Sequence, residues 1–438
     1  MSSHRKEERR GSKALNRLEA DQDWQRLLSW LPPDLEAIAV QMGAFRRPRV
    51  VTNGAMLLRL VLLYAVGTYS LADVAAWAAR ALGIELTADA LAYRFTHATA
   101  WIEQLVVLLL HHPVGPVSGQ GTVLRVIDAS VLTVPGSTGT DWRLHVTFDP
   151  VHSTILGLEL TDSHGAEHLA RACGRRGDVV IADRAYGHAS DVRVARERQM
   201  HCLLRAHLQN LPVQQDQQRL APAQLLDEAD AGQVERNVKI PEHGYPPVAA
   251  RLIVVPLSAE NAARARQSLR KARKGRVPSA LTLRLAGYFC CITTLSAQQV
   301  SVETVLRCYR LRWQVELLFK RCKSLLHLDH LPQARPALVK LLVWARLLIA
   351  LVVERMAFAT RQAIPFDSVG PPVSQWRLTQ IHLQDVVLAV YGSTSLDHRL
   401  AAARATAMRL RERPRKKRSW ATQQPPRLDL PPGGACLA

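Results

Sequence analysis

The sequence contains few cysteines, and none of them is spaced to bind a metal ion. Seven cysteines are scattered over 438 residues, without a Cys-x-x-Cys pair and without a cysteine and histidine cluster of zinc spacing. A scattered set is typical of a reducing compartment, where thiols act as small core side chains. We therefore expect a protein of the reducing cytoplasm with free thiols.

Long apolar runs suited to a membrane are also missing. The first ten residues are polar and basic and lack the hydrophobic stretch of a signal peptide. The longest apolar run, 338–353, is short for a bilayer span and contains Lys340 and Arg346, whose charges are costly in lipid. We expect this run to form a buried core helix, and we expect no association with a membrane.

Acidic residues are scarce relative to basic ones. The chain has 57 lysines and arginines against 37 aspartates and glutamates, which gives a formal charge of +20. Such an excess favours a polyanionic partner, with nucleic acid first and an anionic membrane second. A highly charged soluble protein without such a partner is the alternative. The apolar content of 48% is that of a globular protein long enough for two or three domains.

The spacing of apolar residues predicts a change from helices to strands near Gly121. Before it, an N-cap at Ser70 and a break at Gly83 indicate helix, turn and helix, compatible with a DNA-reading module or with ordinary helical packing. After it, period-two and continuous apolar patterns predict the order β-β-β-α-β-α-β. The expected strands are 122–133, 143–148, 154–160, 178–183 and 201–206, and the expected helices are 167–173 and 189–199.

The rest of the chain differs in composition. Residues 207–300 contain two strand-like pieces, 248–256 and 281–294, with a cationic stretch at 264–276 that we interpret as a basic arm. A long helix over 302–326 and an apolar helix over 336–360 are expected next. We predict a basic flexible arm at 1–20 and a helical DNA-recognition domain at 21–120. The core follows in two parts, 121–206 and 301–360, on either side of a mainly β insertion at 207–300. A helical C-terminal region at 361–408 and a basic disordered tail at 409–438 complete the predicted organisation.

Two aspartates lie at the ends of apolar strand segments. Asp128 follows the apolar half of the first strand, and Asp183 follows the continuous apolar strand. A poorly solvated carboxylate needs a partner, and carboxylates on adjacent strands can bridge a hard divalent cation such as Mg²⁺ or Mn²⁺. A third carboxylate from a packed helix would complete a two-metal site for phosphodiester chemistry. Taken singly, each aspartate is also explained as a turn cap.

The third carboxylate is expected in the helix over 302–326. Tyr309, Arg312, Glu316 and Lys323 follow one another at steps of three, four and seven, which puts them on one face of a regular helix. A carboxylate between two cations on a half-buried face indicates a site. An amphipathic helix with ion pairs between neighbouring turns is the other interpretation of this spacing.

These residues carry a resemblance to a known family. The pattern Tyr-x2-Arg-x3-Glu-x6-Lys, met by Tyr309, Arg312, Glu316 and Lys323, resembles the signature of bacterial insertion-sequence-four-type transposases. The segments 141–149 and 160–167 also resemble that family. The strand order, with acids on the first and fourth strands, resembles the ribonuclease-H-like fold of DDE transposases. The resemblance covers about residues 55–360.

The resemblance implies a function and roles for individual residues. Asp128, Asp183 and Glu316 would be the catalytic, metal-binding triad for Mg²⁺ or Mn²⁺, with two ions per site. Tyr309, Arg312 and Lys323 would contact the DNA backbone, and Arg184 would reach the DNA or pair with Asp183. Tyr288 holds the place of an aromatic, often Trp, that stacks on a flipped base; it is equally explained as plain strand core.

The implied protein is a bacterial, nucleoid-associated cut-and-paste transposase. It would form a homodimer on double-stranded DNA, bind the terminal inverted repeats of its element, cleave them and join them to target DNA. Two alternatives remain open: a catalytically inactive or repurposed DNA-binding protein derived from a transposase, and a nuclease that cuts without joining. The neighbouring acids Asp162 and Glu167 are expected to be structural or to support the triad.

Overall fold

The structure is a computed structural model that describes residues 21–44, 49–67, 69–111, 123–272, 277–332, 335–364 and 373–392. The predicted basic arm at 1–20 and basic tail at 409–438 lie outside these residues. The chain divides into two compact units. One comprises Met1–Pro116, Val131–Trp142 and Leu317–Thr422, and the other Val117–Ser130, Arg143–Glu316 and Gln423–Ala438.

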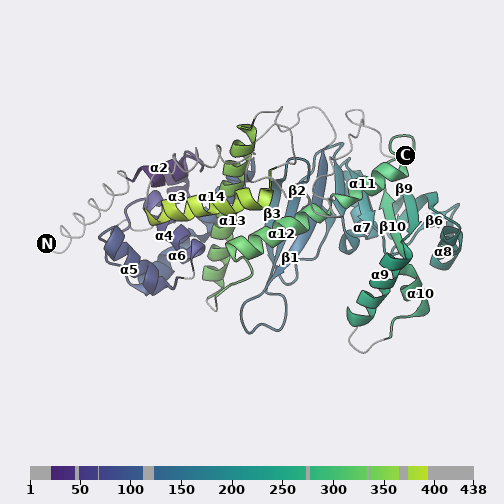
Figure 1. Ribbon diagram of the computed structural model, residues 1–438, viewed down its shortest axis with the longest axis horizontal. Helices are drawn as coiled ribbons and strands as arrows, with labels where there is room; N and C mark the ends of the chain where they lie inside the picture. Colours follow the sequence, from purple (N-terminus) through teal and green to yellow (C-terminus); the bar gives the residue numbers. More distant parts are fainter. Residues whose placement is uncertain are drawn as a thin grey trace. The chain divides into compact units, whose positions relative to one another are not determined.

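The first unit is built mainly from helices (Figure 1). Its elements are α2 (Gln22–Leu28), α3 (Leu35–Gln41), α4 (Gly54–Val66), α5 (Leu71–Ala81), α6 (Ala88–His111), α13 (Pro336–Gln362) and α14 (Gln375–Tyr391). Ser70 and Asp73 form a reciprocal capping box at the start of α5, and Gly83 follows that helix with a φ of 70°. The predicted helix, turn and helix is therefore present.

Helix α13 forms the apolar centre of this unit. It is long and apolar enough to cross a membrane by length and composition, but 83% of its most apolar window is buried inside the protein. The guanidinium of Arg346 is itself buried and donates to the backbone oxygens of Ala65, His327 and His330. The prediction of a buried core helix over 338–353 is confirmed, because protein carbonyls satisfy the cation that lipid would not.

The second unit contains a ten-stranded sheet. Its strands are β1 (Leu124–Leu132), β2 (Trp142–Asp149), β3 (Thr154–Asp162), β4 (Val179–Ala182), β5 (His201–Arg205), β6 (Gln214–Gln215), β7 (Gln218–Arg219), β8 (Val234–Glu242), β9 (Tyr245–Pro256) and β10 (Tyr288–Thr293). The order across the sheet is β3-β2-β1-β4-β5-β10-β9-β8-β6-β7. Strand β4 pairs in parallel with β1 and with β5, whereas β10 runs antiparallel to β5 and β9. All five strands predicted between 122 and 206 are present.

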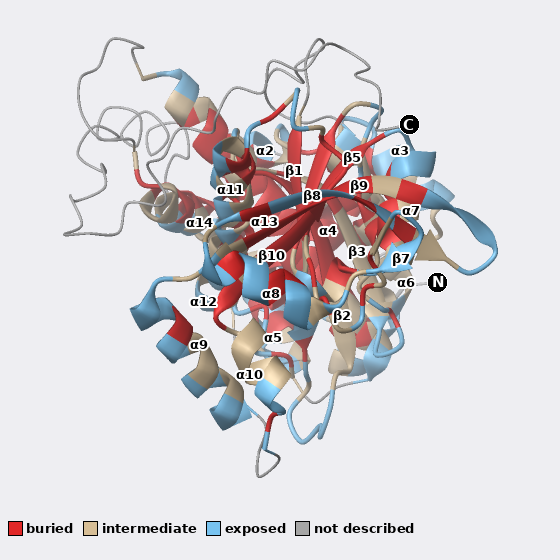
Figure 2. Ribbon diagram, turned by 90° about the vertical axis from the view of Figure 1, so that its right-hand side faces the viewer, coloured by how far each residue is buried: buried red, intermediate tan, exposed pale blue. Residues whose placement is uncertain are grey.

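Helical segments of the second unit connect or extend the strands. They are the short 3-10 turns η1 (Leu169–Arg171) and η2 (Arg184–Tyr186), the helices α7 (Ala189–Glu197), α8 (Pro222–Asp230), α9 (Ala259–Ala272), α10 (Ala280–Leu285) and α11 (Val302–Arg310), and the start of α12 (Trp313–Leu326). Figure 2 shows the strands β1, β5, β9 and β10 mostly buried and α9 with much exposed surface. One large apolar cluster joins side chains of the strands β4, β5, β8, β9 and β10 to side chains of the helices α7 and α8.

Three predicted elements of this unit differ from those observed. The helix expected at 167–173 is only the turn η1. Residues 281–285, expected in a strand, belong to α10, because the Ser279 side chain caps that helix by accepting from the Thr282 amide. The described part of the expected basic arm forms α9, and residues 273–276 lie outside the description. The segment 207–300 thus contains helices as well as strands and is mixed rather than mainly β.

Candidate active site

Two parallel strands bring the two aspartates together. In the pairing of β1 with β4, Val126 lies opposite Ile181; Asp128 follows two residues later within β1, and Asp183 lies one residue beyond the end of β4. Because the two strands are parallel neighbours, this register brings both carboxylates to the same region of the sheet. Near the other end of these strands, the buried Arg125 and Asp178 form an ion pair that fixes the register.

Local hydrogen bonds orient both aspartates. One oxygen of Asp128 accepts from the Ala129 amide at 2.8 Å. One oxygen of Asp183 accepts from the Ala185 amide at 2.8 Å, which begins the turn η2. The turn-capping interpretation of Asp183 is therefore correct. It does not exclude a site, because an ionised carboxylate has room for about four acceptor contacts.

The signature residues do not lie on one continuous helix, contrary to the prediction. Helix α11 ends at Arg310 and α12 begins at Trp313. Between them, amides bond to carbonyls three residues back, from Leu311 to Cys308 and from Val315 to Arg312. This is the tighter 3-10 pattern, which turns by about 120° per residue instead of about 100°. The regular helical spacing is therefore lost where Arg312 lies.

Arg312 nevertheless joins the predicted acids. Its Nη1 donates to Oδ2 of Asp128 at 3.1 Å, and its Nη2 donates to the Glu316 carboxylate. The side chain of Arg312 is 18% exposed and those of Asp128 and Glu316 are 15% and 34% exposed. One guanidinium thus bridges a strand carboxylate and a helix carboxylate in a partly buried pocket.

The acidic cluster of Asp128, Asp183 and Glu316 is partly buried, and Arg312 bridges two of its members. Burial raises the pKa of Asp128 to about 7, and the neighbouring Asp183 and Glu316 add to this, against the Ala129 amide and Arg312. Burial alone would lower the pKa of Arg312, but the surrounding Tyr309, Glu316 and Asp128 raise it above the ordinary value. One arginine therefore compensates the acids incompletely.

Two further residues belong to this acidic pocket. Burial, with Asp183 nearby, raises the pKa of Glu167, whose carboxylate lies 3.8 Å from the Arg143 guanidinium. The Tyr186 side chain is fully buried, its hydroxyl has no hydrogen-bond partner among the described residues, and burial together with Glu167, Asp128 and Asp183 raises its pKa. Sequence analysis gave Glu167 only a supporting role and did not single out Tyr186. The signal available was the position of Tyr186 three residues after Asp183.

The other predicted DNA contacts lie on different elements. The ring of Tyr309 packs against Phe289 with centroids 4.8 Å apart, and burial raises the pKa of Tyr309 to about 12. Arg205 lies over the same Phe289 ring at 6.0 Å. Lys323 is on the part of α12 that belongs to the other unit, where its Nζ lies 3.5 Å from the backbone oxygen of Val131.

Tyr288 and Arg184 line one cavity of about 430 Å³, together with Arg205, Cys290 and residues of α9 and α10. The Tyr288 ring is only 6% exposed and its hydroxyl donates to Asp230, which also accepts from Arg284 at 2.6 Å. Little of this ring is therefore free to stack on a base. Burial and the nearby Arg205 lower the pKa of Arg184.

The donor chemistry of the pocket suits a hard divalent cation. Asp128, Asp183 and Glu316 offer carboxylate oxygens in a site with excess negative charge, as Mg²⁺ and Mn²⁺ prefer. In the described parts of the chain, no three histidine, cysteine, aspartate or glutamate side chains converge closely enough for one ion. The residues fit such an ion as donors, with Arg312 lying between two of them.

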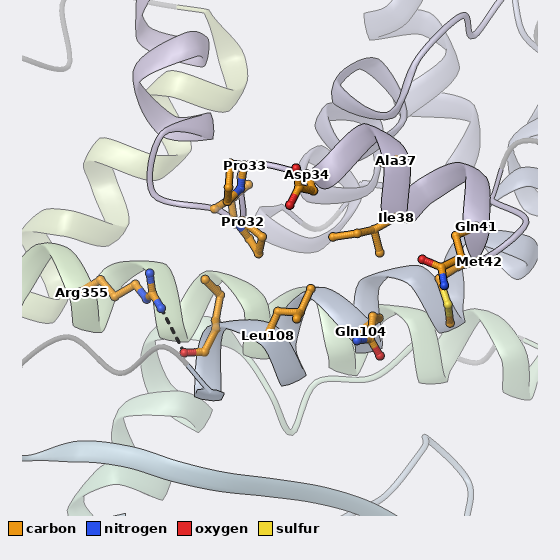
Figure 3. A pocket seen from close by; sticks show the side chains of 12 residues that line it. Pro32, Pro33, Asp34, Ala37, Ile38, Gln41, Met42, Gln104, Leu108 and Arg355 are labelled. Carbon is orange, nitrogen blue, oxygen red and sulfur yellow. Dashed lines mark hydrogen bonds between the residues drawn. The ribbon is translucent and has the colours of Figure 1, made fainter. Parts of the chain in front are cut away.

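A second cavity lies in the helical unit and has a different character. It measures about 720 Å³ and lies between α3 and the C-terminal part of α6 (Figure 3). Its lining is largely apolar, with Asp34 and Arg355 as its charged residues, and Arg355 donates to the backbone oxygen of Leu109. Without a group of acids, this cavity does not offer the chemistry of the sheet-edge pocket.

Comparison with known proteins identifies the family to which this site belongs. Residues 119–352 match the family model of the transposase DDE domain, and this range contains the three acids and the five predicted DNA contacts. The chain is 36% identical over 345 residues to the putative transposase InsL for insertion sequence element IS186A of Escherichia coli strain K12, covering 76% of this chain and 93% of the relative. The transposase for insertion sequence element IS421 of Escherichia coli is 36% identical over 346 residues, with the same coverage.

Proposed function

Because the chain belongs to the DDE-domain transposases of insertion sequences, we propose that Asp128, Asp183 and Glu316 are its catalytic carboxylates. The chain is a DNA transposase, and DDE domains generally use divalent metal ions. The observation that carries the proposal is the ionic connection of the strand acid Asp128 to the helix acid Glu316 through Arg312, beside Asp183.

The proposed reaction is cut-and-paste transposition. The protein binds the terminal inverted repeats of its element, a phosphodiester at the end is hydrolysed to free a 3′ hydroxyl, and this hydroxyl attacks target DNA. The metal supplies Lewis acidity at the attacking and leaving oxygens when it is bound; we propose Mg²⁺, replaceable by Mn²⁺, with two ions per site. The protein holds the scissile phosphate in place and compensates its charge.

Five residues are proposed to hold the DNA near the cleaved bond. Arg312 offers a planar fork to phosphate, Lys323 a point charge and Tyr309 a phenol that its contact with Phe289 orients. Arg184 adds a cation beside Asp183, and the coulombic repulsion that it shares with Arg205 would be relieved by a phosphate. Tyr288 lines the same cavity as Arg184.

The arrangement of the sheet supports the ribonuclease-H-like core that we propose for this unit. Strands β1, β4 and β5 are parallel, with β2 and β3 continuing the sheet beyond β1, and the acids come from the first and fourth strands. We also retain the predicted domain bounds, with 207–300 as a mixed insertion of helices and strands and with end recognition by the helical domain at 21–120. Because two ends must be paired, we propose a homodimer on DNA, in the bacterial cytoplasm at the nucleoid.

Incubation with a labelled duplex that carries the element's own end tests this function. We expect nicking at the end with Mg²⁺ and none with EDTA, followed by products joined to target DNA. Nicking without joined products would identify a nuclease. Tight binding without nicking, by folded protein and with a verified end, would favour the repurposed DNA-binding protein.

A further inference from the structure

Arg312 lies between two of the carboxylates that are proposed to bind a divalent cation. Its two terminal nitrogens donate to two different carboxylates, one on β1 and one on α12. The other Asp128 oxygen already accepts from the Ala129 amide. The guanidinium thus engages one oxygen of each carboxylate, and a metal ion that binds Asp128 and Glu316 together would lie close to it, where the two cations repel each other.

The location of Arg312 allows it to move without unfolding a helix. It lies in the 3-10 stretch between α11 and α12, where the ordinary helical hydrogen bonds are already replaced. Such stretches within helices are common at functional hinges. Its long side chain is partly exposed, whereas the Arg125 side chain of the structural pair with Asp178 is 8% exposed and that of Asp178 is 5%.

DNA offers the released guanidinium an alternative partner. A phosphate accepts the same two parallel hydrogen bonds as a carboxylate and carries the charge that Arg312 would lose. If a metal ion displaced Arg312 from the carboxylates, a DNA phosphate would stabilise the displaced guanidinium. The metal ion and DNA would then each favour the binding of the other, because a coupling free energy between two binding sites is the same in both directions.

We propose that Arg312 is an exchangeable internal cation that couples metal binding to DNA binding. In this inference, which rests on the proposed function, Arg312 pairs with Asp128 and Glu316 in the resting protein and moves to a DNA phosphate when the metal binds. In addition to contacting DNA, Arg312 would keep the affinity for metal low until DNA is bound.

Metal affinity without DNA tests the exchange directly. Purified full-length protein is titrated with Mn²⁺, and the remaining free ion is measured by its paramagnetic resonance signal. We expect Arg312→Ala to bind Mn²⁺ about tenfold more tightly than the unmodified protein. Arg312→Lys, which keeps the charge but loses the fork, is expected to bind more tightly too. Lys320→Ala, a control at an exposed lysine of α12 with no proposed role, is expected to leave Mn²⁺ affinity unchanged.

The outcomes separate this inference from the proposed function. Unchanged or weaker Mn²⁺ binding in Arg312→Ala, with a native circular dichroism spectrum, would overturn the exchange and make the ion pairs static. If Arg312→Ala binds Mn²⁺ more tightly but Arg312→Lys does not, the gain in affinity is a general effect of charge, and this result would also overturn the proposed exchange. If Asp128→Asn binds Mn²⁺ as well as the unmodified protein does, the proposed metal site itself fails.

The predicted effect of a divalent cation on DNA binding can be measured without DNA cleavage. Fluorescence anisotropy of a labelled duplex is measured in EDTA and in Ca²⁺, with Ca²⁺ as the probe ion. We expect Ca²⁺ to tighten duplex binding by the unmodified protein by about tenfold and to have little effect on Arg312→Ala. An equal effect of Ca²⁺ on both proteins would contradict the coupling.

Discussion

The buried hydroxyl of Tyr186 leads us to predict that its removal stabilises the protein. The side chain is fully buried near Asp128, Asp183 and Glu167, and its hydroxyl has no hydrogen-bond partner within the part of the chain that the structure describes. A buried polar group without a hydrogen bond costs about 1–3 kcal/mol. Replacing Tyr186 with Phe removes that group and leaves the ring in place. We expect Tyr186→Phe to raise the free energy of unfolding of the metal-free protein by about 1 kcal/mol.

Tyr288 supplies the matched control. Its ring is also buried, at 6% exposure, but its hydroxyl donates to Asp230. Tyr288→Phe removes the same atom and with it a hydrogen bond to a carboxylate. Because Asp230 is 58% exposed, we expect a loss of only about 1 kcal/mol. The two substitutions are chemically identical and are predicted to change stability in opposite directions.

Urea unfolding in EDTA, followed by circular dichroism and tryptophan fluorescence, measures both variants. The difference between them is expected to be about 2 kcal/mol in favour of Tyr186→Phe. If Tyr186→Phe destabilises the protein as much as Tyr288→Phe, the Tyr186 hydroxyl makes a hydrogen bond in solution. This would refute the claim that the Tyr186 hydroxyl, although it lies near Asp128, Asp183 and Glu167, donates a hydrogen bond to none of them.

Three other predictions address the strands, the additional acid and the DNA contacts. Asp178→Ala leaves the buried Arg125 without its carboxylate and should cost about 3–5 kcal/mol in urea unfolding, so a loss below about 1 kcal/mol would contradict a structural ion pair. Glu167→Gln should slow end cleavage by about 10–100-fold, and complete inactivity would mean that Glu167 is a main ligand beside Asp183. Lys323→Ala should lower the slope of duplex affinity against salt, on logarithmic axes, by about one, and an unchanged slope would exclude a phosphate contact.

The sheet could be predicted from the sequence because its strands are marked by short-range patterns. The continuous apolar run before Asp183 predicts a central strand, and the structure gives β4 at Val179–Ala182 with all four residues buried. The two aspartates were predicted at strand ends on adjacent strands, and β1 and β4 are neighbours in parallel register. Burial on both faces leaves a signal in every residue of such a strand.

The helices around the site could be predicted less well, since their ends depend on contacts distant in sequence. No proline or glycine marks the break between α11 and α12, so a regular spacing at Tyr309, Arg312 and Glu316 predicted one helix. The bridge from Arg312 to Asp128 spans 184 positions in the chain and has no local signature. Glu167 likewise has no local signature, because the course of the chain after β3 brings its carboxylate near Asp183.

The central claim is that Asp128, Asp183 and Glu316 form one catalytic centre. The most direct measurement is the rate of Mg²⁺-dependent end nicking by Asp128→Asn, Asp183→Asn and Glu316→Gln. Asp149→Asn is the control, because Asp149 is a buried aspartate of the same sheet that accepts from the Val151 and His152 amides in a turn. We predict that each triad variant, while still binding the duplex, loses nicking to background and that the control keeps it. Substantial nicking by any folded triad variant would contradict the assignment.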